Sequence, residues 1–214
     1  QFPTRQFLDV SNEESIKTFF EKNDVESIIH LAAVAKVVYS DNNKELVYNT
    51  NIKGTRLLLK YAKESGVKFF IYLSTACVYS GENQGMYSED DIPYPKHYYG
   101  WSKLVAEEIS KSFDSNEFQV IIVRTNFTKM PWEYPRAFTD RFGTYLFGKG
   151  VAKGLKEIWS KKPNLPIIHL CGEKKLSMYE YAKLGNSDVG EMTFEDYKEN
   201  TPLTKNMCLK TNYW

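Results

Sequence analysis

Hydrophobic and polar positions follow two different periods along the chain, and each period predicts a different kind of element. Between residues 45 and 65, apolar side chains recur at intervals of three and four, at Tyr48, Ile52, Thr55, Leu59 and Ala62. This spacing places them on one face of a long helix. Gly66 then stands in the position that favours the end of a helix. Short, continuous apolar runs, such as residues 25–33, predict buried strands instead.

Strands and helices are predicted to alternate over most of the length. The predicted strands cover residues 25–33, 68–74, 118–124 and 167–171. The predicted helices cover residues 11–22, 45–65 and 98–113, an amphipathic segment that ends near residue 161, and two small segments at residues 177–180 and 194–197. Such alternation predicts a doubly wound, Rossmann-like α/β fold with a parallel sheet, in which ligands bind at the carboxyl ends of the strands.

The first residues carry two further predictions. Ser11 and Glu14 have the spacing of a capping box, which predicts that Ser11 starts the first helix. The residues from Gln1 to Asp9 are expected to form the end of a further strand.

The composition excludes several classes of protein. Of 214 residues, 28 are Lys or Arg and 27 are Asp or Glu, so the net charge of +1 gives no general attraction for nucleic acid. No apolar run reaches the roughly 18 residues that a membrane span needs. Cys77, Cys171 and Cys208 form no CxxC pair, which argues against a disulfide framework or a zinc site. We therefore expect a globular, cytoplasmic protein with no nucleic-acid partner, no membrane partner and no metal.

Three of the predicted strand ends carry residues that could contact a ligand. Ala32 and Ala33 are small enough to let a flat ligand approach the backbone, although tight packing of a helix on the sheet explains them equally well. Thr75 could direct its hydroxyl to a ligand or bond the local turn, which is the commoner arrangement. Asn126 follows the third of these strands. The carboxyl edge of the sheet is therefore the expected place of a site.

Tyr99 and Lys103 lie four residues apart at the start of the helix that follows Thr75. One helical turn brings them to the same face, where an ammonium group would stabilise the phenolate and lower the pKa of the Tyr. A Tyr of lowered pKa exchanges a proton with a substrate near neutral pH. The spacing predicts a pair suited to acid–base chemistry.

This Tyr-x-x-x-Lys spacing is not specific by itself. It occurs three times in the chain, at Tyr99/Lys103, Tyr145/Lys149 and Tyr179/Lys183. Only the first pair opens the helix that follows, after a polar loop, a strand that ends in Ser-Thr. The second begins a predicted helix without such a partner, and the third lies in a small C-terminal helix. Context therefore favours the first pair.

Several motifs together resemble a known family. They lie at residues 30–33 (HLAA), 48–55 (YNTNIKGT), 70–81 (FIYLSTACVYSG), 98–108 (YYGWSKLVAEE) and 120–125 (VIIVRT). In this order and spacing they resemble an extended short-chain dehydrogenase/reductase of the NAD-dependent epimerase/dehydratase family, which acts on nucleotide-activated sugars. Residues 131–140 and the short C-terminal region look most like the dTDP-4-dehydrorhamnose reductases within that family.

The resemblance implies three catalytic residues, Thr75, Tyr99 and Lys103. Tyr99 would act as general acid or base on a sugar hydroxyl or carbonyl, while Thr75 bonds the same sugar oxygen. Lys103 would hold the nicotinamide ribose. The implied reaction is reduction of a nucleotide sugar, or its epimerisation, through a 4-keto sugar. Dehydratases of the family carry an Asp-Glu pair after the Thr, and Ala76-Cys77 in that place disfavours elimination of water.

The resemblance also implies NAD or NADP as cofactor and a nucleotide sugar as substrate. The implied cofactor-binding residues are Asp9, Val10, Leu31, Ala32, Ala33, Asn51, Tyr99 and Lys103. The implied substrate-binding residues are Thr75, Asn126, Lys129 and Arg136. Arg141 lies in the same region, and its guanidinium, like the other basic groups there, could pair with the diphosphate or be an ordinary surface charge.

Two regions and a partner follow from the same resemblance. Residues 1–125 would form a partial dinucleotide-binding domain that contains the catalytic residues, and residues 126–214 the last sheet elements and a substrate-binding region. Reductases of this kind often form homodimers, so a homodimer is the expected assembly.

The chain departs from the family at its start. The family begins with a strand, a Gly-rich phosphate loop, a helix and a second strand, and no Gly-x-x-Gly-x-x-Gly motif occurs in this sequence. Without those strands, one edge of the strand at residues 25–33 would be exposed. We expect either a fragment of a complete enzyme or a natural truncation covered by another chain. The second case leads to an alternative function, a non-catalytic protein that binds a sugar nucleotide or a partner. The residue that selects between NAD and NADP is absent from the sequence.

Overall fold

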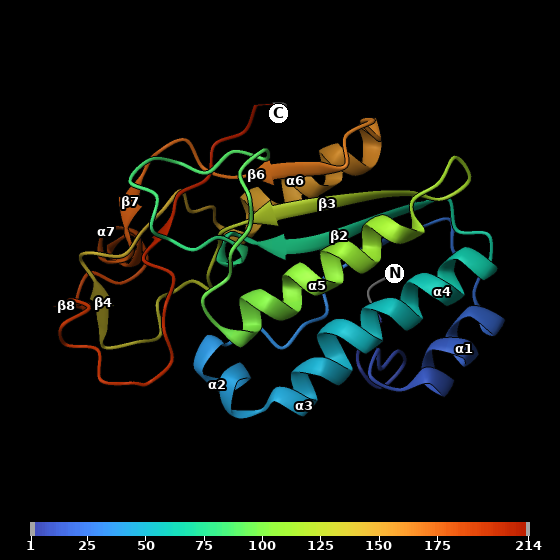
Figure 1. The fold of residues 1–214 in the computed structure, drawn as a ribbon, viewed down its shortest axis with the longest axis horizontal. Helices are drawn as coiled ribbons and strands as arrows, with labels where there is room; N and C mark the ends of the chain where they lie inside the picture. Colours follow the sequence, from blue (N-terminus) through green and yellow to red (C-terminus); the bar gives the residue numbers. More distant parts are fainter. Residues whose placement is uncertain (1–2, 213–214) are drawn as a thin grey trace.

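The centre of the molecule is a parallel sheet of four strands (Figure 1). The computed structural model describes residues 3–212. The strands are β1 (Ser27–His30), β2 (Phe69–Thr75), β3 (Gln119–Thr125) and β6 (Ile167–Leu170), in the order β1-β2-β3-β6. All three pairings are parallel, with Ile29 opposite Ile71 and Thr75 opposite Thr125. The α/β prediction is confirmed, and β1 forms one edge of the sheet.

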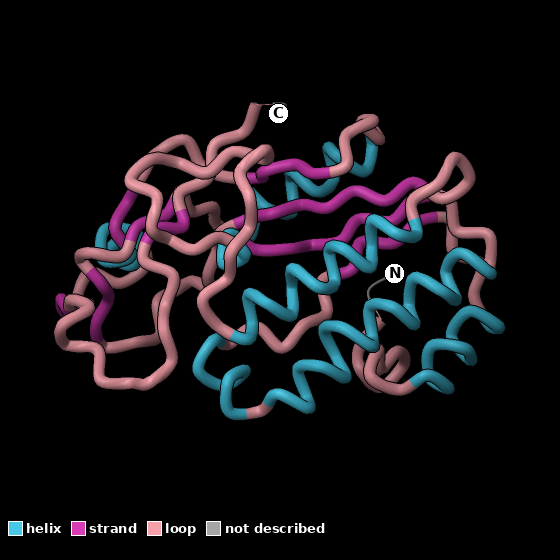
Figure 2. The backbone as a smooth tube through the Cα atoms, viewed as in Figure 1, coloured by secondary structure: helices cyan, strands magenta, loops and turns pink. Residues whose placement is uncertain are grey.

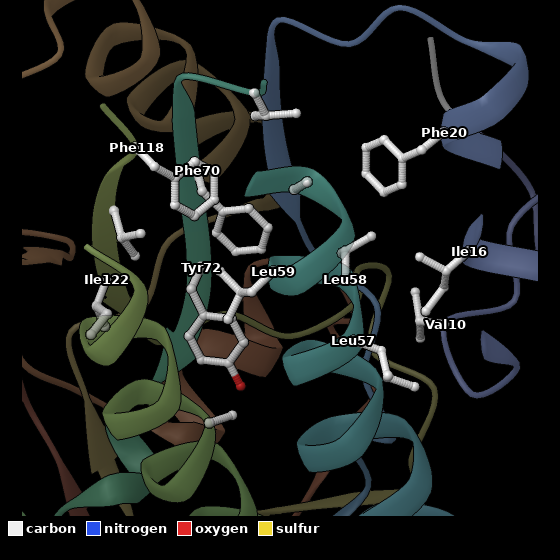
Figure 3. Close-up of a cluster of buried hydrophobic side chains, with 14 residues drawn as sticks. Val10, Ile16, Phe20, Leu57, Leu58, Leu59, Phe70, Tyr72, Phe118 and Ile122 are labelled. Atoms are coloured by element: carbon white, nitrogen blue, oxygen red, sulfur yellow. The ribbon is translucent and has the colours of Figure 1, made fainter. Parts of the chain in front are cut away.

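Helices cover both faces of this sheet. On one face lie α1 (Glu13–Lys22), α4 (Thr55–Glu64) and α5 (Tyr98–Phe113), and on the other lies α6 (Gly148–Lys161). Alternate residues of β2 enter the two cores, because side chains of a strand point to opposite faces in turn. Phe70 and Tyr72 pack against α4, as Figure 3 shows. Phe69 and Ile71 pack against α6.

The helix predicted over residues 45–65 exists, but it changes type along its length. It consists of α3 (Lys44–Val47), a π-helical segment η1 (Tyr48–Gly54) and α4, and a short helix α2 (Val37–Asn42) precedes it. Gly54 lies so close to the carbonyl oxygen of Val10 that a Cβ there would be 2.6 Å from it. Gly66 has a φ of +80°, so the predicted glycine stop of the helix is confirmed.

A small lobe lies beyond the carboxyl ends of the strands (Figure 2). Its elements are β4 (Arg136–Phe138), β5 (Phe142–Gly143), β7 (Leu176–Ser177), α7 (Met178–Lys183), β8 (Gly190–Met192) and β9 (Asn206–Met207). β4 pairs with β8, and β5 lies between β7 and β9. A 3-10 turn, η2 (Ala76–Val78), follows β2 toward this lobe. The lobe therefore covers the sheet edge at which a ligand was expected.

Three local predictions were wrong. The chain from Pro3 to Asn12 forms turns instead of a strand, because no neighbouring strand lies there to accept its hydrogen bonds; Gln1 and Phe2 lie outside the described residues. The N-cap of α1 is Asn12, whose side chain accepts the N–H groups of Glu14 and Ser15.

The third wrong prediction concerns the segment Phe194–Tyr197, which forms a turn instead of a helix. Its amide groups are held by Asp140 and Asp196. Within residues 3–212, no helix is both long enough and apolar enough to cross a membrane.

Candidate active site

Thr75 and Tyr99 meet where β2 ends and α5 begins. The hydroxyl of Thr75 accepts the N–H of Cys77 at 3.2 Å and lies near enough to the phenol of Tyr99 to lower its pKa. Gly100 makes this approach possible, because a Cβ there would stand 2.3 Å from the carbonyl oxygen of Cys77. The start of α5 can therefore press against the turn that follows Thr75.

Lys103 is buried one helical turn further along α5. Its Nζ donates a hydrogen bond of 2.7 Å to the carbonyl oxygen of Leu73 and lies 4.1 Å from the ring centroid of Tyr72. Burial lowers the pKa of Lys103 to about 7, although the charge of Glu107 opposes this change. The ammonium is thus held against the end of β2. Its lowered pKa means that it loses its proton near neutral pH.

The expected lowering of the Tyr99 pKa was wrong for the chain alone. Burial raises the pKa of Tyr99 well above its usual value of 10, and the nearby hydroxyl of Thr75 opposes this only in part. The nearby thiol of Cys77 raises the pKa further. In the chain alone the phenol is therefore protonated at neutral pH, as a group that donates a proton must be.

His97 caps α5 and supports Tyr99 from the side. Its Nδ1 accepts the N–H of Gly100 at 3.1 Å, and its ring stacks on Tyr99 with centroids 6.1 Å apart. Burial lowers the pKa of His97 to about 4, and the charge of Arg141 adds to this effect. The ring is neutral near pH 7, as acceptance of the Gly100 N–H requires.

A buried ion pair fixes α5 to the sheet behind these residues. Arg124 on β3 and Glu107 on α5 are 1% and 0% exposed, and Nη2 of the first lies 2.7 Å from Oε2 of the second. Ser74, next to Thr75, donates its hydroxyl to Glu107. Nη1 of Arg124 donates to the hydroxyl of Tyr79 at 2.6 Å. These contacts join the ends of β2 and β3 to α5.

Four of the residues expected at the cofactor lie at or near the carboxyl end of β1. Leu31 and Ala32 are exposed after β1, and Ala33 is half-buried. Asn51, in η1, is buried and links two elements: its amide group bonds the backbone of Val34 at 2.8 and 3.1 Å and the hydroxyl of Ser102 at 3.0 Å.

The first two expected cofactor residues lie in the N-terminal turn. The carboxylate of Asp9 accepts the N–H and hydroxyl of Ser11 and pairs with Arg5 at 3.0 Å. The hydrogen bonds from Ser11 lower the pKa of Asp9. The side chain of Val10 is buried in the core beside α4, as Figure 3 shows, so its backbone is the part that remains for a ligand.

The residues expected at the substrate divide into buried and exposed ones. Asn126 is buried, and its side chain donates to the carbonyl oxygen of Met207 at 3.3 Å. Lys129 and Arg136 are exposed, and the ammonium of Lys129 is engaged by Glu133. Arg141 is buried instead. Only burial separates it from the other basic side chains, and the sequence gives no measure of that.

One residue that the sequence analysis set aside lies in the same cluster. Tyr145 is buried together with Cys77, and Tyr99 packs against the same group. It lies three residues before α6 in irregular chain, and not in a helix with Lys149 as expected. No local signal distinguishes Tyr145, because its place in the site depends on contacts that are distant in sequence. Among residues 3–212, no cluster of three or more His, Cys, Asp or Glu residues suits a metal ion.

Comparison with known proteins shows the family of this chain. The model of the NAD dependent epimerase/dehydratase family matches residues 3–141. The mouse dTDP-D-glucose 4,6-dehydratase is 30% identical over 139 residues, which cover 64% of this chain and 39% of that enzyme. A UDP-glucuronate 4-epimerase from Thermodesulfobacterium geofontis is 33% identical over 106 residues, which cover 50% of this chain and 33% of that enzyme.

Solved structures share the fold over nearly the whole chain. A dTDP-4-dehydrorhamnose reductase from Clostridium acetobutylicum superposes with a TM-score of 0.86 at 23% identity, over 98% of this chain and 80% of that one. The reductase from Bacillus anthracis, in complex with NADP, gives 0.85 at 21% identity, over 99% and 81%.

The parallel sheet, the Thr75–Tyr99–Lys103 arrangement and the family match define the class of this protein as an extended Rossmann-like dehydrogenase/reductase fold. The chain belongs to the NAD-dependent epimerase/dehydratase family. It spans about two fifths or less of the length of the curated relatives named above.

Proposed function

We propose that this chain carries the acid–base centre of an NAD(P)-dependent oxidoreductase that acts on a nucleotide-activated sugar, by reduction or epimerisation through a 4-keto sugar. The observation that carries the proposal is the placement of Thr75 at the end of β2 near the phenol of Tyr99, with Lys103 one turn further along α5. The matched relatives are enzymes, which does not favour the alternative of a non-catalytic binding protein.

The residues present fit the nicotinamide half of a dinucleotide. Ala32 and Ala33 leave the carboxyl end of β1 uncovered, and Lys103 offers a buried ammonium at the end of β2, one helical turn after Tyr99. The NADP complex of the Bacillus anthracis reductase supports NAD or NADP as the cofactor. When bound, the dinucleotide supplies the two-electron redox chemistry that no side chain of the site provides.

The side chains of the chain itself then orient the sugar and move one proton. Thr75 and Tyr99 present two hydroxyl groups to the same sugar oxygen, and His97 holds the phenol in place by stacking. Because the pKa of Tyr99 is raised, the phenol enters as the proton donor. A donor suits the reduction of a carbonyl, whereas removal of a proton from a sugar hydroxyl needs a lower pKa.

The two predicted regions stay part of this proposal. Residues 1–125 supply the acid–base groups and the cofactor side, and residues 126–214 supply β6 and the lobe over the sugar. Asn126, Lys129 and Arg136 are proposed substrate contacts, and a homodimer is the proposed assembly.

Replacement of Tyr99 by Phe tests the proposal. The variant removes the donated proton and should lower the turnover of a dTDP- or UDP-4-keto sugar by about 10²- to 10⁴-fold, measured by the absorbance of NADH or NADPH. Tyr98→Phe is the matched control, because this neighbour stacks on Trp101 outside the cluster. Activity that survives in the Tyr99 variant contradicts the mechanism.

A further inference from the structure

Arg141 is a buried cation without an anionic partner in the part of the chain that the structure describes. The residue is 9% exposed, and none of the ion pairs among residues 3–212 includes it. Its Nε donates to the carbonyl oxygen of Thr204 at 2.9 Å. Nη1 and Nη2 lie 3.9 and 3.4 Å from the sulfur atoms of Met178 and Met207. Thioethers are weak acceptors, and buried charges are normally paired.

The guanidinium therefore keeps donors for another group. Each terminal nitrogen carries two N–H groups, and each has a single hydrogen-bond contact, to sulfur, within residues 3–212. Two further N–H groups on adjacent nitrogens remain, which matches the two oxygens of a carboxylate.

Tyr145 gives a second, independent sign of a ligand. This residue is 7% exposed, and its hydroxyl has no hydrogen-bond partner within residues 3–212. Burial raises the pKa of Tyr145, the charge of Arg141 opposes that change, and the thiol of Cys77 adds to it. The phenol therefore lies near both groups and has an O–H to donate.

Arg141 is connected to the acid–base pair through neighbouring side chains. The sulfur of Met207 contacts Nη2 of Arg141 at 3.4 Å and Sγ of Cys77 at 3.8 Å, and Cys77 donates its N–H to Thr75. The charge of Arg141 also acts on His97, whose ring stacks on Tyr99. Under the proposed function the sugar reacts at Thr75 and Tyr99, and these contacts place Arg141 in the packing around that position.

The acidic side chains of the surrounding elements are engaged elsewhere. Asp41 accepts the N–H of Tyr98 at 2.9 Å and acts on His97 and Tyr197 only through its charge. Asp140, the neighbour of Arg141 in the chain, pairs with Lys205 at 3.8 Å.

The positions of the substituents on a pyranose ring indicate which group of the sugar lies near Arg141. The diphosphate of a nucleotide sugar is attached at C1, across the ring from C4, whereas the substituent on C5 is next to C4. We propose that Arg141 and Tyr145 bind a carboxylate on C5 of the sugar, so that the substrate class is a nucleotide-activated uronic acid. The inference rests on the proposed function and gives it a substrate class.

Two sugar nucleotides that differ only at this position provide the test. UDP-glucuronate carries a carboxylate where UDP-glucose carries a hydroxymethyl group, and both have the same diphosphate. We expect calorimetry with the full chain to show binding of UDP-glucuronate about tenfold tighter or more. Arg141→Met should reduce the affinity for UDP-glucuronate to that for UDP-glucose and leave the second unchanged. Arg56→Met, at an exposed position on α4, is the matched control and should change neither.

Tyr145→Phe removes a single hydroxyl and keeps the ring, so it serves if Arg141→Met does not fold. We expect it to weaken UDP-glucuronate binding severalfold without an effect on UDP-glucose. Equal affinities in the wild type overturn the inference. An equal loss for both ligands in the Arg141 variant also overturns it, because the guanidinium would then hold the diphosphate.

Absence of binding by either nucleotide sugar would contradict the proposed function. The carboxylate site is then tested alone, with free glucuronate against chloride at constant ionic strength. An increase in Tm of the wild type that Arg141→Met lacks supports the site. The same increase in both proteins, or none in the wild type, overturns it.

Discussion

The candidate site has one side at strand β1 and another at the lobe, and the two sides differ in how exposed their residues are to solvent. On the side of β1, Ile29 is 37% exposed and Leu31 is 52% exposed, so the sheet edge presents apolar surface and bare backbone. On the side of the lobe, Tyr145 and Arg141 are 7% and 9% exposed. The β1 side of the site is therefore open, and we call it the shelf. The lobe side, around Arg141 and Tyr145, is closed, and we call it the wall.

This difference separates the proposed sugar side of the site, which the chain forms by itself, from the proposed cofactor side, which it leaves open. The wall contains the groups that would hold a sugar, and they are fixed by contacts within the chain. The shelf offers small residues and one buried ammonium, and it depends on what binds there. The Arg124–Glu107 pair joins β3 to α5, and through Ser74 and Tyr79 it also contacts the end of β2 and the chain that follows.

The largest effect is expected where α5 is joined to β3. Glu107→Gln leaves the buried Arg124 without its anion, and loss of one partner of a buried pair costs about 3–5 kcal/mol. Urea denaturation followed by circular dichroism measures this as a lower midpoint. Glu108→Gln is the control, because that side chain is exposed and pairs with Lys111 at the surface. Similar midpoints for the two variants would show that the pair does not hold α5 to the sheet.

The closed wall should resist added volume. A Cβ at Gly143 would lie 2.3 Å from Nδ2 of Asn126 and 2.7 Å from Cζ of Tyr145. We expect Gly143→Ala to lower the free energy of unfolding by about 1–3 kcal/mol. Gly148→Ala, where a Cβ meets nothing within 4 Å, is the matched control. An unchanged unfolding curve for Gly143→Ala would mean that the wall is loose.

The pH dependence of stability should report on Lys103, the buried cation expected at the cofactor. The pKa of Lys103 is lowered from 10.5 to about 7 in the folded chain, so between these values the unfolded chain binds the additional proton. Lys103 therefore contributes a rise of stability with pH in this window, by about 1.4 kcal/mol per pH unit at most. Urea midpoints at pH 7.5 and 9.0 measure the rise, and Lys103→Met should remove it. Burial raises the pKa of Cys171 and of Cys208 to about 11, so their titration in the unfolded chain acts in the opposite direction within this window. The difference between wild type and Lys103→Met isolates the contribution of Lys103.

The smallest effect is expected at the outer strand. Ile29 and Ile71 are register partners in β1 and β2, but the second is fully buried. Ile71→Ala should cost about 2–5 kcal/mol, whereas Ile29→Ala should cost less than about 1 kcal/mol. A large cost at Ile29 would show that another chain covers this edge in solution, and the oligomeric state would then be measured by sedimentation.

Much of the fold could be predicted because its elements are set by local periodicity. The helix predicted over residues 98–113 has the predicted bounds, since a capping His97 and an apolar face specify both. The strand expected before Asp9 does not exist, because a strand needs a neighbour and periodicity cannot supply one. The π-helical segment was also missed, since intervals of three and four do not distinguish it from an α-helix.

The site could be predicted only in part, for the same reason. Thr75 and Tyr99 meet because strand ends and helix starts adjoin in this fold. The direction of the Tyr99 pKa depends on burial, which the sequence does not reveal. Arg141 and Tyr145 are distinguished only by tertiary packing.

The π-helical segment η1 (Tyr48–Gly54) determines the directions in which residues before and after it face around the helix axis. A π turn holds an additional residue, and each residue of a helix turns the chain by about 100°. Asn51 can therefore face Ser102 while Leu57 and Leu58 face the core. A chain shortened by one residue here would regain a uniform helix and lose one of these two alignments.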